Sequence, residues 1–362
     1  EGALCECFHS LGWSGTLQDA KTISEGLLLM GTRFLVPHGF FYTTHGLAKH
    51  DAPPTFFFQM PYWPLYGRLS ERVARVAGEF EGTHIAARTL VVDPNAGLPT
   101  RAQLADYERF LHHLMGAHVD YLVVDTDILE SGEIEDGRVT IRDIAADTVV
   151  VPQMRLVEEH LAAWLERFAA AGGTVVRITD GDEGADVARQ IAEAGGASLR
   201  ITGAGNVGRL WAVQRRSTDR TLWFLVHTGG EALDVTLDAD SALREVPLED
   251  GAPALLRPVP EGRGYWRRVA PFESFLLEAV PMPAEAADPL PVVVAPVSAP
   301  SAVRPLQANL LRLGEWEMTL HDEAGETLQT ETVRAVPLAN QLAEGGFRLA
   351  PEFTLYFGHA PT

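Results

Sequence analysis

The chain has 362 residues, of which 46% are hydrophobic, so it is long enough for two to four domains with cores of their own. Its formal net charge of −20 argues against nucleic-acid binding, and no apolar run is long enough to span a membrane. Its two cysteines, Cys5 and Cys7, flank Glu6; we interpret them as small apolar residues on one strand face rather than as a metal site.

The first elements alternate between strand and helix. An apolar strand is expected at 3–8, a helix at 17–30, a second strand at 33–36, and a second helix at 66–81 after a long aromatic loop. This β-α-β-α order is the repeating unit of a parallel barrel or sheet.

The alternation continues from about residue 84 to 201, which predicts a small open parallel sheet interrupted by an acidic hairpin-like excursion at 130–142. Short strands follow from residue 198 and predict a β-sandwich. The segment 203–208 matches G-x-G-x-x-G, but an alternating segment typical of a strand follows it, so a dinucleotide site is not expected.

The predicted fold class is therefore α/β plus all-β. The expected boundaries are 1–82 for the last β/α units of a (β/α)8 barrel, 83–200 for a small α/β domain of the flavodoxin or amidotransferase type, 201–283 for a β-sandwich, 284–305 for a Pro- and Ala-rich linker, and 306–362 for the start of a further β-sandwich module.

Aromatic, His and Gln side chains gather just after the predicted strands at 3–8 and 33–36. In parallel α/β proteins this edge binds ligands, and aromatic faces with a few hydrogen-bonding groups suit a sugar. The alternative is a rigid, packed loop without a ligand. The candidate substrate-binding residues are His9, Trp13, His38, Tyr42, Gln59, Tyr62 and Trp63.

Glu6 is the candidate catalytic residue, because a charged group within an apolar strand is costly to bury unless it forms an ion pair or hydrogen bonds, or has a catalytic role. Pairing with Arg33 or a backbone N–H is the structural alternative. A carboxylate beside aromatics and histidines suits glycoside hydrolysis, and we expect Glu6 and His38 to line one pocket. Weaker candidates for a second carboxylate are Asp51, Asp93 and Asp125.

A metal held by His38, His45 and His50 is disfavoured, because these histidines do not show the spacing of a known zinc motif. No cofactor is evident from the residues. Serine hydrolysis is also unsupported, because the chain lacks a G-x-S-x-G motif.

The segments C-E-C-F-H-S-L-G-W, V-P-H-G-F-F-Y-T-T-H-G and P-P-T-F-F-F-Q-M-P-Y-W resemble the last two β/α units of the barrel in large bacterial glycoside hydrolases. They are most similar to the α-L-rhamnosidase type, glycoside hydrolase family 106, with its relatives in the family-2-like clan. The resemblance implies that Glu6 is the base or nucleophile and that His38, Tyr42, Gln59 and Trp63 lie near the substrate. It also implies calcium, whose ligands cannot be placed here, and a general acid on a barrel strand before residue 1.

The sequence thus predicts part of a longer glycosidase that removes a terminal sugar, with α-L-rhamnose as the sugar that the resemblance suggests, from an oligo- or polysaccharide. The function class favours a periplasmic or extracellular location, although no signal peptide is recognised in the chain. The first rival is a non-catalytic carbohydrate-binding or scaffold protein. The second is an amidotransferase-like enzyme centred on the middle domain, which has no cysteine nucleophile.

Overall fold

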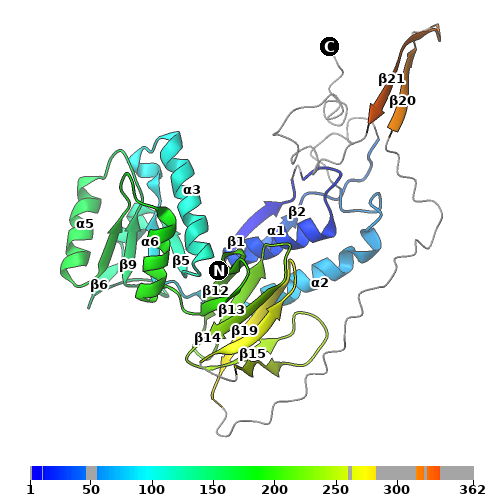
Figure 1. Cartoon of the computed structure of the whole chain (residues 1–362). Helices are drawn as coiled ribbons and strands as arrows, with labels where there is room; N and C mark the ends of the chain where they lie inside the picture. The colour runs from blue at the N-terminus through cyan, green and yellow to red at the C-terminus, as the bar shows by residue number, and fades with distance from the viewer. Residues whose placement is uncertain are drawn as a thin grey trace. The chain divides into compact units, whose positions relative to one another are not determined.

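A computed structural model describes residues 2–9, 11–45, 55–259, 263–282, 315–321 and 324–334 (Figure 1). The chain divides into two compact units. The first comprises 1–7, 17–36 and 65–288, and the second comprises 8–16, 37–64 and 289–362. The predicted linker at 284–305 and the last predicted strand, at 353–357, lie outside the described residues.

The first β/α elements form as the sequence predicts. Strand β1 (Ala3–Cys7) pairs with β2 (Thr32–Pro37), and helix α1 (Leu17–Leu29) connects them, as is usual for parallel strands. Gly31, at φ +101°, ends α1 in the left-handed conformation that favours glycine. Helix α2 (Trp63–Glu79) follows the aromatic loop. In the described residues β1 and β2 make a two-stranded sheet, so the closed barrel stays a prediction.

A four-stranded parallel sheet forms the middle of the first unit. Its strands, in spatial order, are β10 (Thr174–Arg177), β9 (Thr148–Val151), β4 (Thr89–Val92) and β5 (Tyr121–Val124). The short Val-rich runs are typical of strands that are covered on both faces. The prediction of a small parallel sheet is confirmed.

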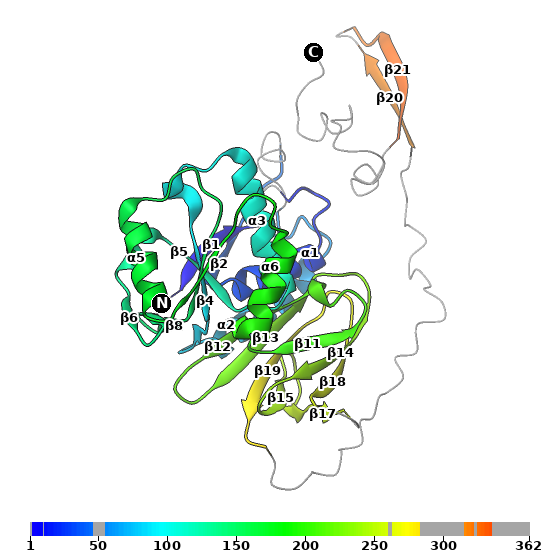
Figure 2. The same ribbon diagram turned by 60° about the vertical axis from the view of Figure 1, so that its left-hand side comes forward.

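Helices cover both faces of this sheet. Helix α3 (Arg101–Gly116) lies beside α6 (Gly184–Ile191) on one face, and α5 (Glu159–Ala170) covers the other (Figures 1 and 2). Thr100 and Gln103 form a capping box at the start of α3.

The acidic excursion near the middle of the chain is a small sheet of its own. After helix α4 (Thr126–Glu130), the strands β6 (Glu133–Glu135), β7 (Arg138–Ile141) and β8 (Ile144–Ala146) form a three-stranded antiparallel sheet.

Two antiparallel sheets follow and share one apolar core, to which both contribute buried residues. The four-stranded sheet runs in the order β11 (Arg200–Ala204), β14 (Leu233–Asp238), β18 (Tyr265–Val269) and β17 (Arg257–Pro258). The six-stranded sheet runs in the order β16 (Ala254–Leu255), β15 (Ala242–Val246), β19 (Ser274–Val280), β13 (Thr221–His227), β12 (Leu210–Arg216) and β3 (His84–Ile85).

The glycine-rich segment at 203–208 joins the first two strands of this region. A single 3-10 turn (Val207–Arg209) leads from it into the strand β12, so the helix that a dinucleotide site needs does not follow. The expectation of a strand at this point is confirmed.

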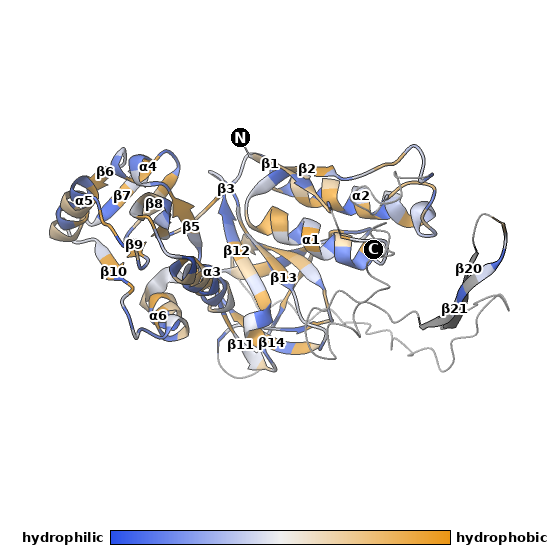
Figure 3. Ribbon diagram, turned by 90° about the horizontal axis from the view of Figure 1, so that it is seen from above, coloured by the Kyte–Doolittle hydropathy of each residue, from blue (hydrophilic) through white to orange (hydrophobic). Residues whose placement is uncertain are grey.

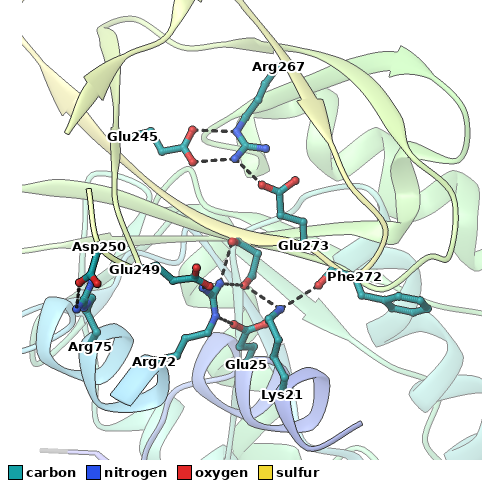
Figure 4. A network of polar contacts seen from close by, with 11 residues as sticks. Lys21, Glu25, Arg72, Arg75, Glu245, Glu249, Asp250, Arg267, Phe272 and Glu273 are labelled. Atoms are coloured by element: carbon teal, nitrogen blue, oxygen red, sulfur yellow. Dashed lines mark hydrogen bonds and ion pairs between the residues drawn. The ribbon is translucent and has the colours of Figure 1, made fainter. Parts of the chain in front are cut away.

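Helices α1 and α2 pack on the six-stranded sheet through Leu28, Val76 and Phe224, and both carry apolar and polar bands (Figure 3). A buried ion network adds to this packing (Figure 4). Glu25, with a side chain 1% exposed, accepts hydrogen bonds from Lys21 Nζ at 2.6 Å and from Arg72 Nε at 2.7 Å. One network therefore joins both helices.

Arg72 extends the same network to the sheet. Its guanidinium donates to the Ser274 carbonyl at 3.1 Å and to the Ser274 hydroxyl at 2.7 Å, at the start of β19. The network therefore fixes the position of α2 along the sheet.

In the second unit, β20 (Glu315–His321) and β21 (Thr327–Arg334) form an antiparallel hairpin. No helix among the described residues has both the length and the apolar character needed to cross a membrane.

Candidate functional site

Strand β1 places Glu6 on its exposed face. Cys7, on the opposite face, is 5% exposed, and its Sγ lies 3.8 Å from the Val36 carbonyl oxygen. Burial raises the pKa of the Cys7 thiol to about 11, with further contributions from Cys5 and Glu6. The strand thus alternates as expected, but Glu6 is exposed rather than enclosed.

Apolar side chains make up most of the exposed face of the β1–β2 sheet. Leu4 is 66% exposed, Phe34 is 54% exposed and Val36 is 45% exposed. Leu35 points to the other face and packs in the core beneath α1 and α2. Among the described residues of β1 and β2, Glu6 is the carboxylate on this solvent-exposed, mainly apolar face, near the end of its strand.

The loops that follow β1 and β2 bring two predicted histidines together in the second unit. The rings of His9 and His38 lie 4.7 Å apart between centroids. His38 also meets the edge of Phe41 at 5.9 Å, and the Phe41 carbonyl accepts a hydrogen bond from Gln59 Nε2 at 2.7 Å. Three candidate residues, His9, His38 and Gln59, therefore belong to one contact network.

Thr55 holds this loop together, although it is not among the residues predicted from the sequence. It is fully buried, and its hydroxyl oxygen accepts hydrogen bonds from Phe41 N at 3.0 Å and Phe57 N at 3.2 Å. The same hydroxyl donates to Gln59 Oε1 at 3.3 Å. Gln59 therefore braces the loop with both ends of its amide; an ST-turn at Thr55 was the only local signal for this arrangement.

The aromatic candidates occupy different parts of the same loop. Trp63 meets the rings of Phe57 at 5.0 Å and Phe40 at 6.1 Å, both nearly perpendicular. Tyr62 lies 6.0 Å from the buried Phe56. Both residues are half-buried.

The two remaining candidates differ in exposure. Trp13 is half-buried, whereas Tyr42 is 94% exposed and projects into solvent. Glu6 and His38 belong to different compact units, and the expectation that they line one pocket stays a prediction.

The other carboxylates considered from the sequence have structural roles where they are described. Asp93 caps a short 3-10 helix by accepting from Asn95 N at 2.8 Å, and Asp125 caps α4 by accepting from Asp127 N at 2.9 Å. Asp51 lies outside the described residues, as does His50. Among the described residues, no group of three or more His, Cys, Asp or Glu side chains is arranged to hold a metal ion.

Comparison with solved structures identifies similar folds. The chain is similar to a rhamnosidase from Novosphingobium sp. PP1Y, with a TM-score of 0.58 and 13% identity over 78% of this chain and 31% of that one. It is also similar to a β-galactosidase from Bacillus circulans sp. alkalophilus (TM-score 0.55, 10% identity, 77% and 56% covered) and to the GH42 β-galactosidase Gan42B (TM-score 0.53, 11% identity, 76% and 53% covered).

No family model matches the sequence, and no curated protein matches it. The chain spans about a third to just over half of the length of these similar structures. It is a mixed α/β protein with several sheets, and its fold occurs in glycoside hydrolases.

Proposed function

We propose that the chain is part of a glycoside hydrolase in which Glu6 is the base or nucleophile. The observation that carries this proposal is the position of Glu6 on the uncovered apolar face of the β1–β2 sheet, near the carboxyl end of its strand. The similarity in fold to three glycoside hydrolases supports it.

The alternation of the two strands fits a segment of a β/α barrel wall. In such a barrel, one side of each strand packs on the helices and the other faces the interior. Cys7 and Leu35 occupy the helix side, whereas Leu4, Glu6 and Phe34 occupy the other. Covering an apolar side chain contributes about 1.5–3 kcal/mol, so further barrel strands would stabilise this face.

Within a barrel mouth, Glu6 would act on the anomeric carbon or on a water molecule beside it. Glycosidases need a second carboxyl group to protonate the leaving oxygen, and we propose that another barrel strand supplies it. His38 directly follows β2 and Trp63 begins α2; the sequence resemblance implies that both lie near the substrate, and we propose that their rings contact the sugar. α-L-Rhamnose is the first sugar to test, because the sequence resemblance points to it.

The test uses the complete open reading frame that encodes this chain, as wild type, Glu6→Gln and Glu6→Ala. Aryl glycosides, including α-L-rhamnoside and β-D-galactoside, report hydrolysis. We expect both variants to lose roughly a thousandfold or more in kcat, because the removed group acts in the transition state. Glu71→Gln, which changes an exposed glutamate on α2, is the matched control and should keep wild-type turnover.

Chemical rescue separates catalysis from structure. If Glu6 is a nucleophile, azide should restore turnover to Glu6→Ala and leave a glycosyl azide, since the small anion enters the space of the lost carboxylate. If Glu6 is a base in an inverting enzyme, azide also displaces the leaving group once and gives an inverted glycosyl azide, so the wild-type product separates the two roles: its configuration is retained if Glu6 is a nucleophile and inverted if Glu6 is a base. Unchanged turnover in Glu6→Gln would refute the assignment. Wild-type protein that binds oligosaccharides without cleaving any of them would favour a carbohydrate-binding role.

A further inference from the structure

A pocket of about 300 Å³ lies at the carboxyl edge of the parallel sheet, far along the chain from Glu6. It opens between α3, the residues that follow β9, and the segment 178–184 that leads into α6. Its volume is at the lower end of the range for small-molecule sites.

The winding of the sheet explains why a pocket forms there. The helix that leaves β4 is α3, which packs Phe110 against Val91 and Val150 on one face. The helix that leaves β9 is α5, which packs Trp164 against the other face. The two connections diverge at this point of the sheet, where open α/β sheets bind ligands, and the pocket is lined there by residues that follow β9 and β10 and by α3.

The loop after β10 is fixed in shape around this pocket. Thr179 donates to Asp182 Oδ2 through its backbone N–H at 2.7 Å and its hydroxyl at 2.8 Å. A Cβ on Gly184 would lie 3.3 Å from the His113 ring, so the approach of α6 to α3 leaves little room for a side chain there. The pocket is therefore bounded by a braced loop and two packed helices.

Gln153 is oriented within this pocket. Its Nε2 donates to Asp180 Oδ1 at 2.6 Å, and this bond leaves the amide oxygen available to a ligand. Gln153 directly follows Pro152 at the end of β9, so its backbone is positioned by the sheet rather than by a mobile loop. Such placement gives a polar group a defined direction before a ligand arrives.

The lining chemistry suits hydroxyl groups. Asp180 and Asp182 supply carboxylate acceptors, and Arg109 is already paired with Asp106 on its own helix. Burial, with a further contribution from Asp93, raises the pKa of Tyr107, so its phenol stays a neutral donor. Acidic side chains outnumber basic ones in the pocket lining, and this negative charge opposes the binding of an anionic ligand. We propose that this pocket binds a neutral, monosaccharide-sized polyol, as a site separate from Glu6.

Ligand-observed NMR titration of the full chain with L-rhamnose, D-galactose and myo-inositol tests the proposal. We expect saturable binding of at least one, with a Kd on the order of millimolar. Gln153→Ala should weaken it about fivefold or more, because one directed acceptor is lost. Gln190→Ala, an exposed amide on α6 outside the pocket lining, is the matched control and should bind like wild type.

Three results would overturn the proposal: no saturable binding of any of the three polyols, wild-type binding by Gln153→Ala, or loss of binding in Glu6→Gln. The last result would place the sugar at the proposed catalytic site instead. Loss of glycosidase activity without loss of this binding would separate the two sites. If circular dichroism shows that Gln153→Ala is unfolded, Asp180→Asn replaces it as the test. Asp180 lies in an exposed loop and accepts the hydrogen bond that orients Gln153.

Discussion

Asp120 links the parallel sheet to the antiparallel region, and its protonation should change the stability of the protein. It is 4% exposed and directly precedes β5. Its carboxylate accepts from Gln214 N in β12 at 2.8 Å and from Ser198 N before β11 at 3.0 Å. Burial raises the pKa of Asp120 from 3.8 to about 6, although both hydrogen bonds and nearby Arg216 lower it.

The sign of the effect follows from proton binding. Because the pKa of Asp120 is higher in the folded state, the folded protein binds more protons than the unfolded chain between about pH 4 and pH 6. The contribution of Asp120 to the free energy of unfolding therefore falls as pH rises through this window. The gap between the two pKa values corresponds to about 3 kcal/mol.

Asp120→Asn removes this titration, and urea unfolding of both proteins between about pH 4 and pH 7 measures the result. The free energy of unfolding of wild type minus that of the variant should fall by about 3 kcal/mol across this range. The titration of all other groups contributes equally to both proteins and cancels in this difference. Asp120 and the exposed Asp143 both line a cavity of about 560 Å³. The control variant Asp143→Asn should show no such fall. A constant or rising difference for Asp120→Asn would refute the reasoning, because it would mean that the hydrogen bonds outweigh burial.

Two further predictions concern the first β/α elements. Arg72→Met should lower the free energy of unfolding by about 3 kcal/mol, because it leaves the carboxylate of Glu25 buried with one partner fewer. Arg75→Met, which loses only an exposed ion pair with Asp250 at 3.6 Å, should lower it by less than about 1 kcal/mol. Equal shifts in Tm for the two variants would contradict this prediction. Cys7 should resist a disulfide reagent at about pH 8 until the protein unfolds, because it is buried and the pKa of its thiol is raised to about 11. The half-buried Cys5 should therefore react first. Mass spectrometry of labelled peptides measures the order, and earlier labelling of Cys7 would contradict its burial against β2.

Local patterns were sufficient for the elements whose neighbours in sequence are also their neighbours in space. Strand β2 (Thr32–Pro37) extends the expected 33–36 by one residue at each end, and α1 (Leu17–Leu29) ends one residue earlier than expected. Apolar periodicity, a capping residue and a terminating glycine act over a few residues, so they can be read without the fold. Asp93 and Asp125, named from the sequence as weaker candidates for a second carboxylate, cap the short helices that follow their strands.

The candidate site was predictable only in part. The strand ends and their aromatic loop located His9 and His38, whose rings do meet. Thr55 could not be identified, because its role depends on the backbone N–H groups of Phe41 and Phe57 on two stretches of the loop. An ST-turn is a local feature and can indicate the hydrogen bond from Phe57 N, but it does not indicate the one from Phe41 N.

The sequence by itself determined the order and type of the elements and the alternation that sets Glu6 opposite Cys7, because side-chain direction along a strand is a local property. Only the tertiary structure decided that α1 and α2 cover the cysteine side and leave Glu6 exposed. It also decided that Asp120 bonds to Gln214, 94 positions further along the chain. Such contacts depend on long-range packing, in which burial and hydrogen bonding join residues that no short pattern relates.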